Sequence, residues 1–327
     1  MKISKYSGLL IALMLLAVPL AAQSNYLYSI LIVIGLYTLL VHGLGILMGY
    51  AGQVSFGHAA FFGLGGYTAA ILTTKFAWTP LPALLASVLL PGIVAAVIGR
   101  QTLKLRELYL ALATLGFGIL VHIIFNEGGE LTGGPSGISG IPHLAIGGFT
   151  FNNDRDFYIL VWVLLVILMT GIKNLIHSRT GRALCAIRES EYAAENAGID
   201  CALLKLQAFI FSALLAGLAG GLYAFYVTFI SPSPFSFHAS VQFVLMAVIG
   251  GLGTFWGPLL GSMVVVALSE VLREVVPLII PNAGGEYQII IYGVILVVLM
   301  IYQPGGLSGI KRYFRRNPNN IINSSSE

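Results

Sequence analysis

Long apolar runs separated by short polar stretches repeat along this chain of 327 residues, and they predict helices that span a membrane. A hydrocarbon core about 30 Å thick takes around 20 helical residues per span. On that measure the sequence predicts an all-α, polytopic membrane protein of about ten helical segments, with glycine-interrupted helices, in one transmembrane domain over residues 1–327. The expected segments cover residues 7–22, 26–48, 58–74, 80–98, 108–125, 157–176, 206–229, 239–251, 257–272 and 287–303.

The composition supports a membrane protein and excludes an ordinary soluble domain. Apolar residues make up 57% of the chain and charged residues 9%, against about 25% charged in a soluble domain. The formal net charge of +4 is explained by membrane topology and does not imply nucleic acid. Cys185 and Cys201 both lie in a polar segment, residues 177–205, which we place in the reducing cytoplasm, so neither a disulfide nor a metal site is expected.

The basic residues follow the positive-inside rule if the N-terminus is cytoplasmic. Of the 17 Lys and Arg side chains, the three expected in outer loops are Lys75, Arg155 and Arg273. The others lie in inner loops or at the chain ends: Lys2, Lys5, Arg100, Lys104, Arg106, Lys173, Arg179, Arg182, Arg188, Lys205, Lys311, Arg312, Arg315 and Arg316. We therefore expect both termini to be cytoplasmic.

The N-terminal residues leave two interpretations open. Lys2 and Lys5 precede an apolar run over residues 8–18 and the small residues Ala21 and Ala22, as in a secretory signal that is cleaved. A first membrane span is favoured, because the polytopic chain that follows needs a first helix whose basic end stays inside.

Two glycine-rich stretches interrupt the apolar pattern: residues 49–58 (GYAGQVSFGH), here called the first glycine segment, and residues 250–258 (GGLGTFWGP), the second glycine segment. Non-helical backbone at membrane depth must line water or be buried in protein, because its unpaired polar groups are costly in lipid. Paired interruptions in the two halves of a chain indicate a translocation path; tight cytoplasmic turns are the alternative. The candidate path residues are Gly52, Gln53, Ser55, Gly57, His58, Gly251 and Thr254.

Ionisable groups are scarce within the expected spans, which disfavours coupling of transport to protons or ions. Glu270 is the only carboxylate in an expected span, and Arg273 lies at the three-residue spacing of a helical ion pair. His42, His58 and His122 are candidates for a proton relay, although a histidine among small residues is more often a packed, hydrogen-bonded side chain. An ion-coupled secondary transporter remains the alternative from another class, and a channel or membrane scaffold is a further one.

The polar segment separates two long apolar runs and holds eight charged side chains in 29 residues, which favours contact with a soluble partner. Residues 189–197 are rich in helix formers, and Arg188 and Glu191 have the spacing of a helical pair. Gly198 is a natural helix stop, and Asp200 is a natural N-cap for the helix that continues into the next span. We expect a short helix, a break and a second helix; an ordinary solvated loop is the alternative.

The outer loop over residues 126–156 is rich in glycine and proline. Its stretch LTGGPSGISGIP, residues 131–142, predicts tight turns rather than a helix. The loop is either a flexible connector or a docking surface for an extracytoplasmic partner.

Several strings in order along the chain resemble one family of transport proteins. Glu191, Ala193, Ala194 and Gly198 match the Glu-x-Ala-Ala pattern, with a downstream Gly, of permease subunits in ATP-binding-cassette importers. More specifically, the chain resembles the branched-chain amino acid permeases of the high-affinity leucine, isoleucine and valine type. The strings that carry the resemblance cover residues 49–62, 109–117, 131–134, 140–142, 188–198, 205–224 and 251–258.

The resemblance implies a permease subunit of the bacterial inner membrane, surrounded by lipid and powered from outside. It implies a second, related permease, two cytoplasmic ATP-binding subunits and an extracytoplasmic solute-binding protein as partners. The ATPase-coupling residues it implies are Glu191, Ala193, Ala194 and Gly198. No enzyme activity, cofactor or metal is expected of this chain, because it lacks a Gly-Lys dipeptide and hence a phosphate loop, and ends without a fused nucleotide-binding domain; ATP is used by the partner subunits.

The resemblance leaves the solute open within a class. Branched-chain or similar amino acids delivered by a solute-binding protein are favoured, and urea or short amides are the alternatives within the same importer class. Specificity is expected to reside mainly in the solute-binding protein.

Overall fold

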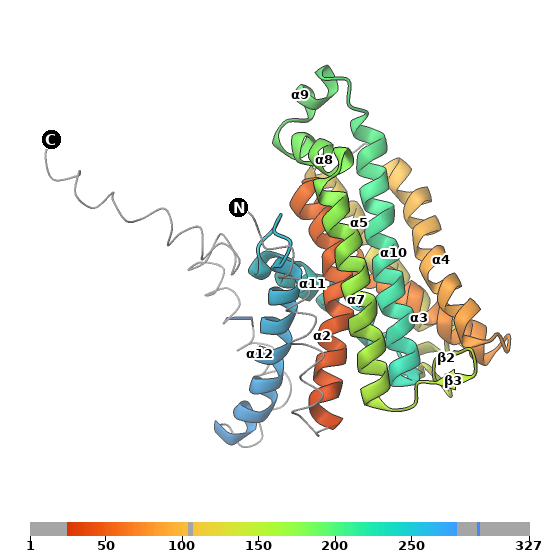
Figure 1. Ribbon diagram of the computed structural model, residues 1–327. Helices are drawn as coiled ribbons and strands as arrows, with labels where there is room; N and C mark the ends of the chain where they lie inside the picture. The colour runs from red at the N-terminus through yellow and green to blue at the C-terminus, as the bar shows by residue number, and fades with distance from the viewer. Residues whose placement is uncertain (1–24, 104–106, 280–292, 295–327) are drawn as a thin grey trace, which may run out of the picture.

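The computed structural model describes residues 25–103, 107–279 and 293–294 of the chain. Within these residues the protein is a bundle of helices (Figure 1), and the prediction of an all-α, polytopic membrane protein is confirmed. Five helical stretches are long and apolar enough to cross a membrane: α2 continued by η1 (Asn25–Tyr50), α4 (Pro80–Thr102), α5 (Glu107–Glu127, apolar from Tyr109), α7 (Asp154–His177) and α10 (Cys201–Val227).

Three shorter or less apolar helices also belong to the bundle: α3 (His58–Thr74), α11 (Phe237–Gly250) and α12 (Gly257–Ile279). Each segment expected between residues 26 and 272 therefore corresponds to a helix, with bounds that differ by a few residues. The expected first span, residues 7–22, lies outside the described residues, as does the last, residues 287–303, apart from residues 293–294.

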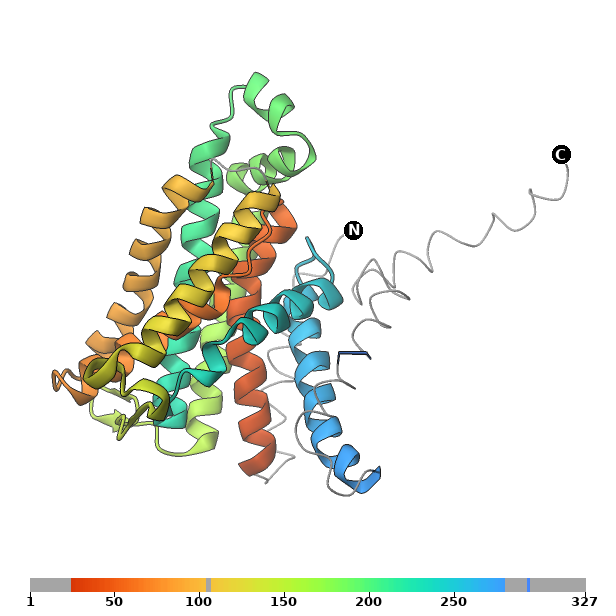
Figure 2. The same cartoon turned by 180° about the vertical axis from the view of Figure 1, so that it is seen from behind.

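The helix α10 runs through the bundle and packs against α2, α3 and α4 (Figures 1 and 2). Small residues let these helices approach closely. A Cβ on Gly65 of α3 would collide with the backbone of Gly217 on α10, and a Cβ on Gly220 would collide with the carbonyl of Phe62. The contact between α3 and α10 thus brings backbone against backbone, which fixes the position of α3.

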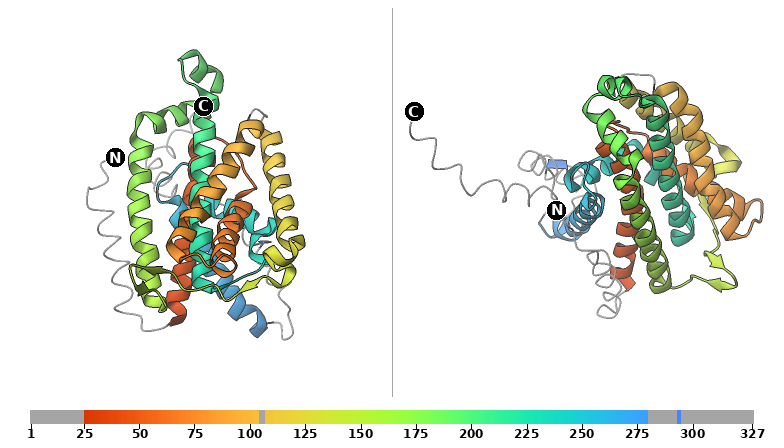
Figure 3. Two further views of the ribbon diagram at one scale, coloured as in Figure 1. Left: turned by 90° about the vertical axis from the view of Figure 1, so that its right-hand side faces the viewer. Right: turned by 45° about the horizontal axis from the view of Figure 1, so that its top comes forward.

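The two ends of the bundle carry different structures. The helices α8 (Arg179–Glu189) and α9 (Glu191–Asn196) lie at one end, and a hairpin of β2 (Ala145–Ile146) and β3 (Phe149–Thr150) lies at the other (Figures 1 and 3). The polar segment and the loop over residues 126–156 therefore lie on opposite sides of the apolar bundle, as the sequence predicts.

Charged residues of α4 and α12 divide between these ends as expected. Arg100 is in the last turn of α4, at the end that carries α8. Arg273 lies toward the opposite end of α12, where Nη1 is 3.4 Å from Oε1 of Glu270, and Glu270 accepts a hydrogen bond of 2.6 Å from Tyr26 at the start of α2. The expected pair of Glu270 and Arg273 is confirmed. Which end faces the cytoplasm stays a prediction.

The loop over residues 126–156 is tied to the segment that follows α10. Ile138 pairs with Ile230, and Gly137, with φ of 73°, lies directly against the carbonyl of Ile230. Gly133 also has a positive φ, of 74°, so tight turns form where the glycines predict them. The short elements are α6 (Gly129–Thr132), η2 (Gly134–Ser136), β1 (Ile138–Ser139), β4 (Phe229–Ile230) and η3 (Ser233–Phe235).

Candidate functional site

The polar segment folds as two short helices divided at Ser190. The backbone of Ser190 is extended, with φ of −161° and ψ of 109°, and its Oγ accepts a hydrogen bond of 3.3 Å from the N–H of Ala193. Ser190 is therefore the N-cap of α9. The expected helix over residues 189–197 is divided here, and the expected pairing of Arg188 with Glu191 is wrong, because the two residues lie on different helices.

The helix α9 ends as the sequence predicts, at Gly198. Gly198 has a φ of 82°, its N–H donates to the carbonyl of Glu195 at 2.9 Å, and the N–H of Ile199 donates to the carbonyl of Ala194 at 3.1 Å. This pair of bonds is a Schellman motif, which requires the left-handed conformation that glycine adopts without strain. Asp200 then caps α10, as expected, by accepting a bond of 3.0 Å from the N–H of Leu203.

The four candidate coupling residues have distinct places on α9. Oε2 of Glu191 lies 2.5 Å from Nζ of Lys205 on α10, whose side chain is only 9% exposed. Ala194 is buried in a small cluster with Ile187 and Cys201. Glu191 and Ala194 therefore hold α9 against α8 and α10, whereas Ala193 and Gly198 are exposed.

The helix α9 lies at the far end of the bundle (Figure 3), and the side chains on its outer face are exposed. These side chains belong to Tyr192, Ala193, Glu195 and Asn196. Tyr192 is 83% exposed, more than any other large apolar or aromatic side chain among the described residues. This face is available to a partner on the side of the bundle where the polar segment lies.

The first glycine segment begins as a π-helix and then loses helical structure inside the bundle. The π-helix η1 (Gly45–Tyr50) continues α2, residues 51–57 are not helical, and α3 begins at His58. Gln53 and Ser55 are buried, so these polar side chains enter the bundle rather than a surface turn.

The contacts of His58 show how far the first glycine segment enters the helix bundle. Nδ1 of His58 is 3.1 Å from Oγ of Ser55, and Nε2 is 2.5 Å from Oγ of Ser212 on α10. Ser212 lies eleven residues after Cys201, the start of α10, which is about 16 Å along a helix. Both ring nitrogens of His58 are hydrogen-bonded, as in a packed histidine.

Side-chain hydroxyl groups from the first glycine segment, α5 and α11 accept hydrogen bonds from backbone N–H groups where the first glycine segment leads into α3. The N–H of Phe56 donates to Oγ1 of Thr114 on α5 at 3.1 Å, that of Gly57 donates to Oγ of Ser55 at 3.4 Å, and that of Ala59 donates to Oγ of Ser240 on α11 at 3.1 Å. These bonds satisfy groups that would otherwise be unpaired inside an apolar bundle. The backbone at the end of the first glycine segment is therefore bonded by protein side chains.

The second glycine segment makes a tight turn between α11 and α12. Gly251 has a φ of 108° and Gly253 a φ of 72°, and Oγ1 of Thr254 donates to the carbonyl of Gly251 at 2.7 Å. The two glycine segments meet at Gly49 and Gly253, where a Cβ on Gly49 would collide with the backbone of Gly253. The contact between the segments thus uses residues outside the candidate path set.

The candidate path residues do not form one cluster. Ser55, Gly57 and His58 lie together inside the bundle, joined by hydrogen bonds. Gly52 lies beside Arg188 of α8, at the end of the bundle with the polar segment, and Gly251 belongs to the separate turn described above.

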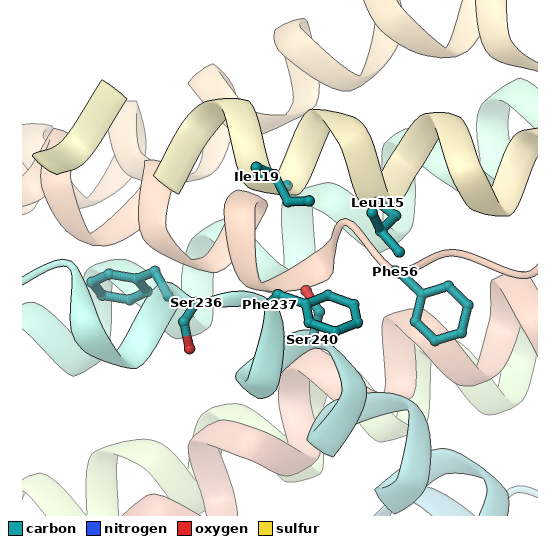
Figure 4. A pocket seen from close by; sticks show the side chains of 8 residues that line it. Phe56, Leu115, Ile119, Ser236, Phe237 and Ser240 are labelled. Carbon is teal, nitrogen blue, oxygen red and sulfur yellow. The ribbon is translucent and has the colours of Figure 1, made fainter. Parts of the chain in front are cut away.

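A groove lies where the first glycine segment, α5 and the start of α11 meet (Figure 4). Most of its lining is apolar, and the hydroxyls of Ser236 and Ser240 are its polar groups. The lining residues are Phe56, Leu115, Gly118, Ile119, Phe235, Ser236, Phe237 and Ser240. None of the seven candidate path residues is among them. Ser240 was not among the predicted residues, because a single serine in an apolar helix has no spacing or motif that distinguishes it.

Aromatic side chains close the bundle on one side of this groove. The ring of Phe235, which lines the groove, lies 5.3 Å from that of Phe62 and 5.8 Å from that of Tyr67, and Tyr67 stacks on Phe125 at 4.1 Å. In the part of the chain that the structure describes, no group of His, Cys, Asp and Glu side chains could hold a metal ion.

Five helical stretches long and apolar enough to cross a membrane, with a helix break buried inside the bundle, define a polytopic membrane protein. Comparison with known proteins agrees with this class. Residues 26–300 match the family described as the permease component of the branched-chain amino acid transport system. The chain belongs to this family.

Individual relatives are similar over most of the chain. The high-affinity branched-chain amino acid transport system permease protein LivM of Escherichia coli is 34% identical over 307 residues, covering 85% of this chain and 68% of the relative. The probable LivM protein of Methanocaldococcus jannaschii is 26% identical, covering 85% and 92%. The LivH permease protein of Escherichia coli is 22% identical, covering 84% and 91%. No solved structure matches the chain.

Proposed function

We propose that this chain is one of two related permease subunits of an ATP-driven importer for branched-chain or chemically similar amino acids. The family match over residues 26–300 is the observation that carries the proposal. Similarity to both LivM and LivH of Escherichia coli, two different permease proteins, supports a pair of related subunits. The chain lies in the bacterial inner membrane with the polar segment in the cytoplasm.

The outer face of α9 receives the partner ATPase in this proposal. The ion pair of Glu191 with Lys205 and the burial of Ala194 attach α9 to the bundle, while Tyr192 and Ala193 face outward. A soluble subunit bound there can move α9 as a unit. Because the polar segment lies in the cytoplasm in this proposal, a cytoplasmic motor acts at this end.

Solute passes along the surface that includes the groove and the first glycine segment. Leu115, Ile119 and Phe237 offer apolar contact to an aliphatic side chain, and Ser236 and Ser240 offer hydroxyls. When the ATPases close, they move α9. The bundle then opens this surface to the other side of the membrane, by alternating access. The solute-binding protein docks at the opposite end, on the loop over residues 126–156.

Uptake by reconstituted vesicles tests the proposal. Vesicles that contain this chain, the second permease, the ATP-binding subunits and the binding protein should accumulate labelled leucine only with ATP present. Unlabelled isoleucine and valine should compete, and urea should not. Accumulation by the purified chain alone, driven by an ion gradient, would refute the proposal, and competition by urea or short amides would move the substrate to that alternative.

A further inference from the structure

One side chain, Arg188 at the end of α8, touches both glycine segments. Its Nη1 donates a hydrogen bond of 2.5 Å to the carbonyl of Gly49. Its Cγ lies 3.2 Å from the position of a Cβ on Gly52, and its Nη1 lies 3.0 Å from the position of a Cβ on Gly253. The guanidinium therefore lies where α8, the end of η1 and the turn between α11 and α12 meet.

The chemistry of this contact makes it directional and strong. Gly49 is in the last turn of η1, where carbonyl groups lack helical partners and the helix dipole is negative. A guanidinium that donates to such a carbonyl forms a charge-assisted hydrogen bond. Because Gly49 also lies directly against the backbone of Gly253, a shift of the Gly49 carbonyl displaces both glycine segments together.

Arg188 belongs to the polar segment and lies on a helix, α8, that is capped and packed against its surroundings. The helix α8 is capped by Ser178, whose Oγ accepts from the N–H of Gly181 at 3.4 Å, and Leu184 and Ile187 are buried. Glu191, the nearest acid in sequence on α9, pairs with Lys205 instead. The guanidinium of Arg188, an otherwise exposed residue, therefore has the Gly49 carbonyl as its hydrogen-bond acceptor.

Arg182, six residues earlier on the same helix, offers a matched comparison. Its Nη1 also donates to a backbone carbonyl, that of His177, at 3.0 Å. This bond stays within the polar segment and reaches neither glycine segment. Arg182 and Arg188 therefore make the same kind of bond from the same helix, and they differ in what the bond connects.

We propose that Arg188 is the positioning residue that transmits movement of the polar segment to both glycine segments. This inference rests on the proposed function, because it assigns the connection between the ATPase-contacting helix α9 and the transport surface. Neither the coupling motif around Glu191 nor the glycine segments themselves include Arg188 among their candidate residues.

The test uses the whole importer, recovered through a tag on this chain and reconstituted in vesicles, with ATP hydrolysis and leucine uptake measured on the same sample. Arg188→Gln should assemble normally and keep near-normal ATP hydrolysis, while leucine transported per ATP falls by about tenfold. Arg182→Gln should match the wild type. Arg188→Lys, which keeps a charged donor, should recover most of the lost ratio.

Three results would overturn the inference. One is an unchanged ratio of leucine to ATP in Arg188→Gln, and another is an equal fall in Arg182→Gln. The third is a parallel loss of assembly, hydrolysis and uptake at a constant ratio, which would mean a purely structural role. Failure of the proposed function is distinguishable, because the wild-type importer itself would then show no ATP-dependent uptake, and the inference would fall with it.

Discussion

Glu191 at the start of α9 and Lys205 in the second turn of α10 form an ion pair of 2.5 Å across the break that Gly198 makes between the two helices. The lysine side chain is 9% exposed and the glutamate side chain 48% exposed. The pair therefore joins a largely buried cation to an anion that solvent reaches, and it sets the angle at which α9 leaves the membrane bundle.

Replacing Glu191 by Gln should loosen α9. The change leaves the Lys205 ammonium largely buried without its anion. This costs more free energy of folding than the ion pair itself contributes. We expect a lower melting temperature for the purified chain and a severalfold lower uptake per ATP by the importer. The double variant Glu191→Gln with Lys205→Met should recover the melting temperature but not the uptake. Equal melting temperatures for the wild type and Glu191→Gln would contradict a role for the pair.

Gly198→Val should uncouple ATP hydrolysis from uptake while membrane insertion stays normal. The φ of 82° at this position costs an L-residue roughly 1–2 kcal/mol, and a β-branched side chain tolerates it least. No atom lies within 4 Å of a Cβ at this position, so backbone conformation alone decides the effect.

Gly198→Asn is the control for that variant, because asparagine adopts the left-handed conformation more readily. Vesicles with Gly198→Asn should retain most of the uptake. If valine and asparagine variants transported equally well, the turn at Gly198 would not be needed for coupling.

Ser240→Ala should destabilise the break in the first glycine segment. The Oγ of Ser240 accepts a bond of 3.1 Å from the buried N–H of Ala59, and an unpaired buried N–H costs about 1–3 kcal/mol. Thermal unfolding of the purified chain should show the loss. Ser269→Ala is the matched control, since Oγ of Ser269 donates to the carbonyl of Val265 in its own helix, at 2.9 Å; a similar loss in both variants would argue against the special position of Ser240.

Gly49→Ala should impair folding or transport by separating the two glycine segments. A Cβ there would collide with the backbone of Gly253, and overpacking of this kind costs about 1–3 kcal/mol. Gly116→Ala on α5 is the control, because nothing lies within 4 Å of a Cβ at that position. Yield of folded protein and leucine uptake measure the effect, and normal values for Gly49→Ala would mean that the segments are not in contact.

Local features of the chain could be predicted without the fold. The start of α3 at His58, the helix stop at Gly198 and the cap at Asp200 follow from residues within a few positions of each other. The pair of Glu270 and Arg273 is of the same kind, because residues three apart are neighbours on any helix. Spans too follow from apolar length alone.

Contacts between distant parts of the chain needed the tertiary structure. Gly49 and Arg188 are 139 positions apart, and Ala59 and Ser240 are 181 apart, so no periodicity or motif relates them. The division of the polar segment at Ser190 also escaped prediction, because helix propensity over residues 189–197 favoured continuity, although the N-cap that Ser190 supplies is itself a local feature.

The sequence by itself determined that this protein is a polytopic membrane protein with a helical polar segment, because hydrocarbon thickness and helix-ending residues act locally, and its strings of family residues indicated the permease family. Only the tertiary structure decided how far the first glycine segment enters the bundle, which hydroxyls bond its backbone, and which side chain connects it to the polar segment. Those relations depend on which helices lie next to one another, and packing of glycine against backbone across α3 and α10 determines that arrangement.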